Sequence, residues 1–139
     1  MANTIQMQDL RYLNLFAEVT RINTRHLIQY NNTCIFCVPK LLLSKAIGRN
    51  SENIKRISQV IKKRVRIIPM PLGIQHAKDF LLAVVAPSSF KDVEFNETEL
   101  IITAGGTQTR ATLFGRNKTR FIELQKVVRD FFDKDLKIV

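Results

Sequence analysis

The stretch Ile47-Gly48-Arg49-Asn50-Ser51-Glu52-Asn53-Ile54 is the most informative part of this sequence, and part of its pattern returns as Phe114-Gly115-Arg116-Asn117. The two glycines are 115 − 48 = 67 positions apart. In each copy an apolar residue precedes the glycine, and an arginine and an asparagine follow it. Because glycine permits a sharp backbone turn, both stretches predict a tight loop between two helices.

The same offset of 67 aligns the sequences on both sides of the loops. Cys34-Ile35-Phe36 falls on Ile101-Ile102-Thr103, two runs typical of strands. After the loops, Ile54, Ile57, Val60 and Ile61 fall on the apolar residues Phe121, Leu124, Val127 and Val128. One short match would be chance, but a match in register over much of the chain indicates a duplicated unit.

Hydrophobic periodicity predicts the same order of elements in each half. In the first half we expect a helix over 5–20, strands over 25–30 and 33–38, helices over 39–47 and 51–63, and a strand over 65–68. Asn31-Asn32 separates the first two strands and suits a tight hairpin turn, since asparagine tolerates positive φ. In the second half we expect a helix over 74–85, strands over 92–95 and 99–104, helices over 107–114 and 119–132, and a strand over 136–139. The last strand follows its counterpart by 71 rather than 67 residues, which predicts about one extra helical turn.

The sequence therefore predicts an α/β (α+β) protein of two small domains, 1–70 and 71–139, each a three-stranded sheet packed on three helices. The boundary lies at Pro69-Met70-Pro71-Leu72-Gly73, which holds half of the prolines and is typical of a linker.

The net charge of +10 is distributed unevenly between the halves. Met1 to Leu72 carries 12 basic and 3 acidic residues, a balance of 12 − 3 = +9. Gly73 to Val139 carries 10 basic and 9 acidic residues, a balance of 10 − 9 = +1. A strongly basic half favours a polyanionic partner such as nucleic acid, because Lys and Arg release condensed counterions when they bind phosphates. The alternative is a solvated basic face that only aids solubility.

Other function classes find little support in the sequence. The longest apolar run, 80–87, is far shorter than the roughly 20 residues of a membrane span. No secretory signal is recognisable either. We therefore expect a soluble, cytoplasmic protein without a membrane partner. Cys34 and Cys37 have metal-like spacing, but a structural zinc site needs two more ligands, and we expect both thiols in the core. No catalytic pattern stands out. We therefore expect no enzymatic activity, no bound metal ion and no cofactor.

The first glycine loop has the composition of a phosphate-binding site. Gly48 supplies the turn, Arg49 a charge, and Asn50 or Ser51 is expected to cap the next helix, whose N–H groups and positive dipole end favour an anion. The cations near the loop are Lys45, Lys55 and Arg56. Ile47 and Ile54 would form an apolar floor for bases, and with only two tyrosines and no tryptophan we expect little aromatic stacking.

The motif around Gly48 resembles the I-G-x-x-G-x-x-I signature of KH domains, whose glycine loop clamps about four single-stranded nucleotides. The element order resembles the type II form, in which a helix and a strand precede the core unit. Two such domains in tandem are similar to the short archaeal form of the NusA transcription factors. This resemblance covers nearly the whole chain and implies RNA binding, a role in transcription elongation, termination or antitermination, and RNA polymerase as a possible partner.

The fourth position of the motif departs from the family pattern. Ser51 replaces glycine in the first half and Lys118 in the second, and Phe114 and Phe121 replace the isoleucines of the second floor. Ser51 can still donate to a phosphate, whereas Lys118 offers charge instead of close approach. The expected contacts of the second loop are Gly115, Arg116, Asn117, Lys118 and Arg120. We expect the first half to bind RNA more strongly than the second. The alternative is that the second half is a degenerate copy that does not bind RNA and only packs against the first.

Two other functions remain open on the sequence. One is a protein–protein adaptor that docks on RNA polymerase or the ribosome, with the basic half on an acidic partner surface. The other is a KH protein of ribosome assembly, which shares the RNA-binding prediction and differs only in its target. In each case we expect a monomer.

Overall fold

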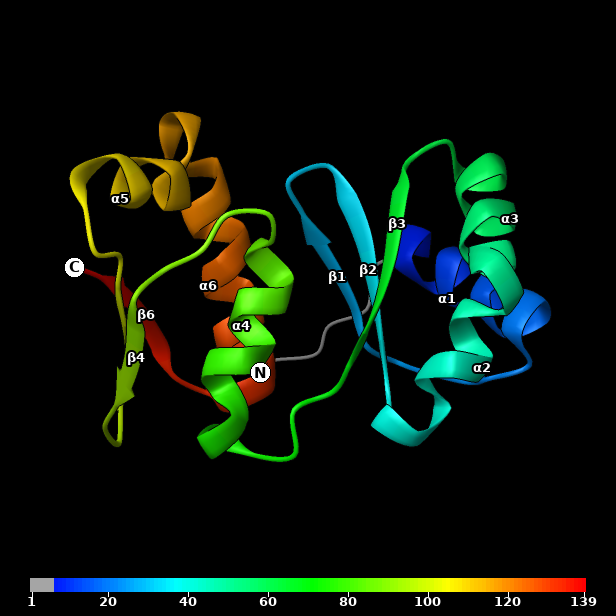
Figure 1. The fold of residues 1–139 in the computed structure, drawn as a ribbon, viewed down its shortest axis with the longest axis horizontal. Helices are drawn as coiled ribbons and strands as arrows, with labels where there is room; N and C mark the ends of the chain where they lie inside the picture. The colour runs from blue at the N-terminus through cyan, green and yellow to red at the C-terminus, as the bar shows by residue number, and fades with distance from the viewer. Residues whose placement is uncertain (1–6) are drawn as a thin grey trace. The chain divides into compact units, whose positions relative to one another are not determined.

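The computed structural model describes residues 7–139, an α+β chain that divides into two compact units between Met70 and Pro71. Each unit contains one three-stranded sheet and three of the six α-helices found in the described residues. The first residues of the helix expected over 5–20 lie outside the described residues. Figure 1 shows the helices of each unit gathered on one face of that unit's own sheet.

The first unit has a hairpin followed by a parallel crossover. Its elements are α1 (Met7–Thr20), β1 (Leu27–Tyr30), β2 (Thr33–Val38), α2 (Leu43–Ile47), α3 (Glu52–Ile61) and β3 (Arg64–Pro69). β1 and β2 pair antiparallel, while β3 pairs parallel to the other edge of β2. Asn31 and Asn32, at φ 50° and 56°, form the two-residue turn of this hairpin, as the sequence predicts. A parallel pair requires a crossover connection, and α2, the glycine loop and α3 supply it.

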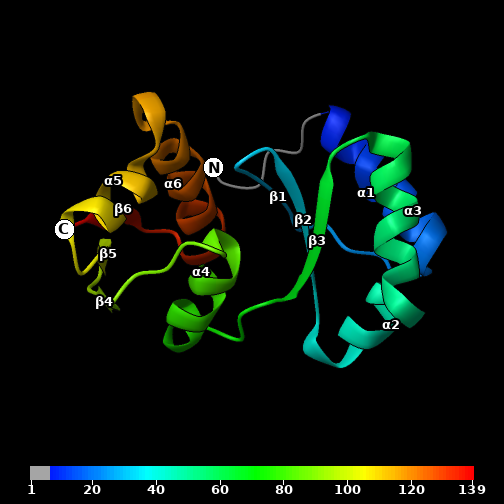
Figure 2. The ribbon, with the colours of Figure 1, turned by 45° about the horizontal axis from the view of Figure 1, so that its top comes forward.

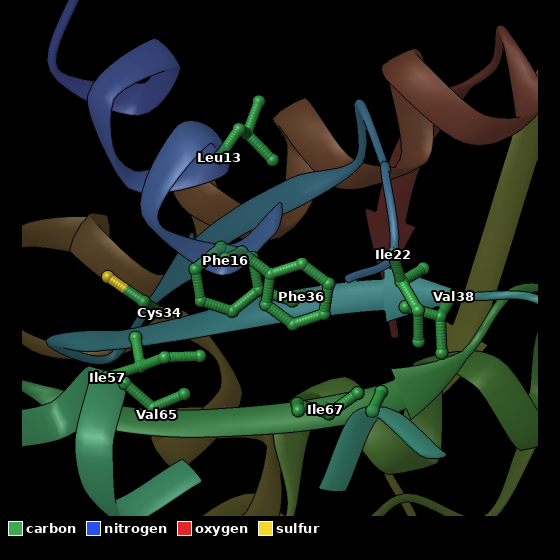
Figure 3. Packing of buried hydrophobic residues seen from close by; sticks show 10 residues of the cluster. Leu13, Phe16, Ile22, Cys34, Phe36, Val38, Ile57, Val65 and Ile67 are labelled. Atoms are coloured by element: carbon green, nitrogen blue, oxygen red, sulfur yellow. The ribbon is translucent and has the colours of Figure 1, made fainter. Parts of the chain in front are cut away.

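The core of the first unit lies between its sheet and its three helices. Phe16 of α1 stacks on Phe36 of β2, with ring centroids 4.5 Å apart and ring planes 15° apart. Both side chains are fully buried, and Ile57 of α3 packs into the same cluster. Figure 3 shows α1 and α3 meeting the strands through these side chains. This cluster holds α3, and with it the glycine loop, in a fixed position relative to the sheet.

The second unit repeats this order and these strand directions. Its elements are α4 (Ala77–Val85), β4 (Asp92–Phe95), β5 (Glu99–Thr103), α5 (Thr107–Phe114), α6 (Thr119–Phe132) and β6 (Asp135–Ile138). β4 and β5 pair antiparallel and β5 and β6 pair parallel. Alternation places Leu100 and Ile102 of β5 in the core, where Leu124 of α6 is also buried. Figure 2 shows α4, α5 and α6 of this unit beside its strands from a second direction.

The predicted elements are all present, although α3 and β1 are shorter than the expected 51–63 and 25–30. Two helices also begin differently. The helix expected from Pro39 is a 3-10 turn, Lys40–Leu42, followed by α2, because Leu42 at φ −99° and ψ 0° departs from α geometry. The helix expected over 74–85 likewise opens with a 3-10 turn, Ile74–His76, before α4. The extra helical turn in the second half is confirmed, since α3 has 10 residues and α6 has 14.

The two cysteines are buried free thiols on opposite faces of β2. Cys34 belongs to the core cluster beneath the helices, and Cys37 lies beside Ile68 of β3 on the other face. Their separation of three residues along a strand causes this. Within residues 7–139, no helix is both long and apolar enough to cross a membrane.

Candidate nucleic-acid interface

In each unit a glycine joins the second and third helices, at a position where no other residue type would fit easily. Gly48 has φ 79° and ψ 172°, and its N–H donates to the Ser44 carbonyl at 3.0 Å, which ends α2. Gly115 has φ 73° and ψ 176°, and its N–H donates to the Ala111 carbonyl at 3.0 Å. These φ values lie in the left-handed region that favours glycine.

The next residues continue the turn with the same backbone geometry in both units. Asn50 and Ser51 have φ/ψ of 54°/35° and 58°/29°. Asn117 and Lys118, their counterparts, have 56°/29° and 60°/23°. Two consecutive left-handed residues reverse the chain and start the following helix at an angle to the preceding one. Thus the structure repeats the loop that the sequence repeats only in part.

The expectation that Asn50 or Ser51 caps α3 through its side chain is wrong. Ser51 occupies the N-cap position of α3, yet within the described residues no side-chain hydrogen bond caps this helix. A capping side chain reaches back from a backbone in the β region, and Ser51 is left-handed. The first N–H groups of α3 are therefore not taken up by a capping side chain.

A side chain from the third helix braces each loop instead. Asn53 Nδ2 of α3 donates to the carbonyls of Lys45 and Ala46, at 3.3 and 3.0 Å. It also lies 3.0 Å from the point where a Cβ on Gly48 would sit. Asn53 thus ties the last turn of α2 to the first turn of α3, and it requires glycine at position 48. The sequence does not predict this role, since Asn53 belongs to no motif or periodic pattern that would indicate it.

Arg120 takes the place of Asn53 in the second unit. Its Nη1 lies 3.5 Å from the Thr112 carbonyl, and its Cγ lies 2.8 Å from the position of a Cβ on Gly115. Thr119 Oγ1 donates to the Arg116 carbonyl at 2.7 Å and closes the loop further. Arg120, expected as a phosphate contact, is therefore also a brace, whereas Arg116, Asn117 and Lys118 are exposed.

The first loop opens onto a hollow of about 470 Å³ at the beginning of α3. Its lining residues are Arg49, Asn50, Glu52, Lys55, Arg56 and Gln59. Four of these were expected from the sequence, and the structure brings them together. Glu52 and Gln59 were missed, although their spacing of three to four residues from Lys55 and Arg56 places them on the same face of a helix.

The remaining expected residues of the first loop have other surroundings. Lys45 is exposed on α2, before the loop. Ile47 and Ile54 are half-buried and pack against the hydrophobic core, so each presents only part of its surface. Gly48 and Ser51 form the turn itself. The hollow thus carries three cations and one carboxylate beside an apolar support, a combination suited to an anionic chain.

The chemistry of a metal site is missing from this region and from the rest of the described chain. Within residues 7–139, no group of three or more His, Cys, Asp or Glu side chains could hold a metal ion. Glu52 is the one carboxylate among the residues that line the hollow, where Arg49, Lys55 and Arg56 outnumber it. The arrangement favours binding of a phosphate through cations and amides.

The fold occurs in a solved protein, while the sequence gives no family assignment. No known family model matches the chain, and neither does any curated protein. The crystal structure of APE1850 superposes with a TM-score of 0.62 and 19% sequence identity, over 97% of this chain and 100% of that one. At this identity the likeness concerns the fold alone. It shows that the two-unit architecture exists as a whole in another protein of similar extent.

Proposed function

We propose that this chain is a single-stranded RNA-binding protein without enzymatic activity. The observation that carries the proposal is the cationic hollow at the first glycine loop, where Arg49, Lys55 and Arg56 converge at the beginning of α3. A helix start offers N–H groups and a positive dipole end to a phosphate. A flexible chain with one charge per nucleotide can follow the cations from the loop along α3.

The modules are proposed to be type II KH domains in tandem, at 1–70 and 71–139. Support comes from the order helix, strand, strand, helix, glycine loop, helix, strand in each unit, with an antiparallel and then a parallel strand pair. The resemblance of the Gly48 motif to the KH signature adds the expected ligand. On this resemblance we further propose a NusA-like role in transcription elongation or termination, with RNA polymerase as a partner.

In the proposed complex, the residues of the first loop have different roles. Gly48 lets the backbone turn, Asn53 holds the turn in place, and the three cations neutralise phosphates. The exposed parts of Ile47 and Ile54 would support bases, since both side chains are only half-buried. Glu52 lies in the first turn of α3, where a carboxylate stabilises the helix and limits how closely an anion approaches.

A charge-matched pair of variants tests RNA binding in the full chain. The site variant is Arg49→Gln/Lys55→Gln/Arg56→Gln, and the control is Arg11→Gln/Arg21→Gln/Arg25→Gln, three exposed arginines of the same unit outside the hollow. Both variants lose three positive charges. In fluorescence anisotropy with a short single-stranded RNA, we expect the site variant to lose about tenfold or more in affinity and the control much less.

Equal losses from the two variants would overturn the assignment of the site, because net charge alone would then explain binding. No binding of the wild type to RNA, combined with capture of a protein from nuclease-treated extract, would favour the adaptor function instead. The proposed role in transcription is tested separately by crosslinking the protein to RNA in cells. Nascent transcripts are the expected targets, and ribosomal precursor RNA would assign the protein to ribosome assembly.

A further inference from the structure

Three side chains form a column beside the second glycine loop. Arg110 of α5 places its guanidinium carbon 4.8 Å from the ring centroid of Phe114. Phe114 in turn stacks on Phe121 of α6, with centroids 5.1 Å apart and planes 18° apart. Phe114 immediately precedes Gly115, so the column adjoins the loop directly.

The first unit shows that the fold does not require this column. At the offset of 67 residues, the positions of Arg110, Phe114 and Phe121 correspond to Leu43, Ile47 and Ile54. Those three aliphatic side chains pack against the core of the first unit. The backbone geometry of the two loops is nonetheless the same, as the φ values of their glycines and of the residues after them show. The second unit therefore has the same loop backbone as the first but different side chains beside it.

The exposure of the column leaves its outermost member available to a ligand. Phe114 and Phe121 are half-buried, whereas Arg110 is exposed. A guanidinium is planar and weakly hydrated, so it can stack on an aromatic ring through one side and on a second flat group through the other. Unpaired bases stack on arginine planes as well as on aromatic rings. The phosphates next to such a base would meet the exposed Arg116 and Lys118 of the same loop.

We propose that Arg110, supported by Phe114 and Phe121, is a base-stacking platform that binds an unpaired base of single-stranded RNA at the second loop. This inference rests on the proposed RNA binding and specifies what the second unit contributes to it. The first unit would bind mainly through charge, and the second through stacking assisted by charge.

The test compares a short oligouridylate with an abasic oligoribose phosphate of the same length, which has the same backbone charge and no bases. Full-length wild type should bind the oligouridylate more tightly than the abasic chain. Arg110→Lys keeps the charge and removes the planar group, so we expect it to lose about fivefold to tenfold in affinity for the oligouridylate and little for the abasic chain. The triple variant Arg110→Lys/Phe114→Ile/Phe121→Ile keeps the charge and installs the first unit's two isoleucines below it, and it should show the same selective loss.

The control is Lys126→Arg, an exposed cation of α6 away from the column, which should leave both affinities unchanged. Thermal unfolding of each variant verifies that the second unit still folds. If Arg110→Lys weakens both ligands equally, or neither, the stacking platform is overturned while RNA binding stands. If the wild type binds neither oligonucleotide, the proposed RNA binding fails and the platform fails with it.

Discussion

Ser51 and Lys118 hold a backbone conformation that glycine adopts more easily. Their φ values of 58° and 60° lie in the left-handed region, where a Cβ costs about 1 kcal/mol or more. Each unit therefore retains a side chain at a position where it costs stability. Strain of this kind is typical of functional sites, and Lys118 places a cation there while Ser51 places a hydroxyl.

Replacement of Ser51 by glycine should relieve this strain. For Ser51→Gly we expect the free energy of unfolding to rise by about 0.5–1 kcal/mol, read from the midpoint of urea denaturation. The matched control is Ser44→Gly, the same substitution within α2, which should lower stability by about the same amount because glycine weakens a helix. If both variants lose stability, the left-handed conformation of Ser51 is not a source of strain.

Burial of Cys37 should make the free energy of unfolding depend on pH in the alkaline range. Burial raises the pKa of its thiol from 9.0 to about 12. Since the folded state then holds the proton more tightly than the unfolded state, the contribution of this group is fully present below about pH 9 and falls as the pH rises toward 12. The difference in unfolding free energy between wild type and Cys37→Ala should therefore shrink over this range. A difference that stays constant with pH would contradict the burial of the thiol.

At the scale of elements, each glycine loop depends on the helix that follows it. α2 has only 5 residues and is held to α3 by Asn53, and α5 is held to α6 by Arg120 in the same way. Amide and guanidinium groups can both reach carbonyls at the end of the preceding helix, which explains why two different residue types occupy equivalent positions. The loop geometry is thus a property of a helix pair.

Loss of this brace should loosen the loop and weaken RNA binding together. For Asn53→Ala we expect a decrease of about 1 kcal/mol in stability, together with faster amide exchange at Gly48 and lower RNA affinity. Asn14→Ala, on the exposed face of α1, serves as the control. It should leave the amide exchange at Gly48 and the RNA affinity unchanged and should not lower stability, because alanine favours a helix. Unchanged amide exchange at Gly48 in Asn53→Ala would show that the turn holds without the brace.

The elements themselves follow from local sequence. The hairpin at Asn31-Asn32, the helix over 119–132 and the extra turn of α6 are predictable because periodicity and turn preferences act over a few residues. The beginning of α2 is less predictable, since the apolar pattern around Leu42 does not indicate that this residue leaves α geometry. Capping at Ser51 is wrongly predicted because residue type alone does not show that its backbone is left-handed.

At the scale of the whole molecule, the charge difference between the halves should govern the salt dependence of binding. With +9 in the first half and +1 in the second, most phosphates should be neutralised by the first. Each phosphate contact on a single strand contributes about −0.7 to the slope of log affinity against log salt concentration.

We therefore expect Lys55→Gln/Arg56→Gln to make this slope less negative by about 1.4, and Arg116→Gln/Lys118→Gln to change it by less. Titration of the full chain with single-stranded RNA over a range of salt concentrations measures both. Equal changes from the two pairs would contradict the asymmetry between the units. A slope of zero in the wild type would contradict electrostatic binding altogether.

The duplicated order of elements, the two glycine turns and the basic first half are predictable from the amino-acid sequence, because each arises from neighbouring residues or from composition. Which side chains meet across a loop depends instead on the folded arrangement of the helices. Asn53 and Arg120 reach back over it, Arg49 joins Lys55 and Arg56 around a hollow, and Arg110 lies over Phe114. These contacts depend on how far and at what angle two helices diverge, and that angle is set by packing on the sheet, which no local pattern records.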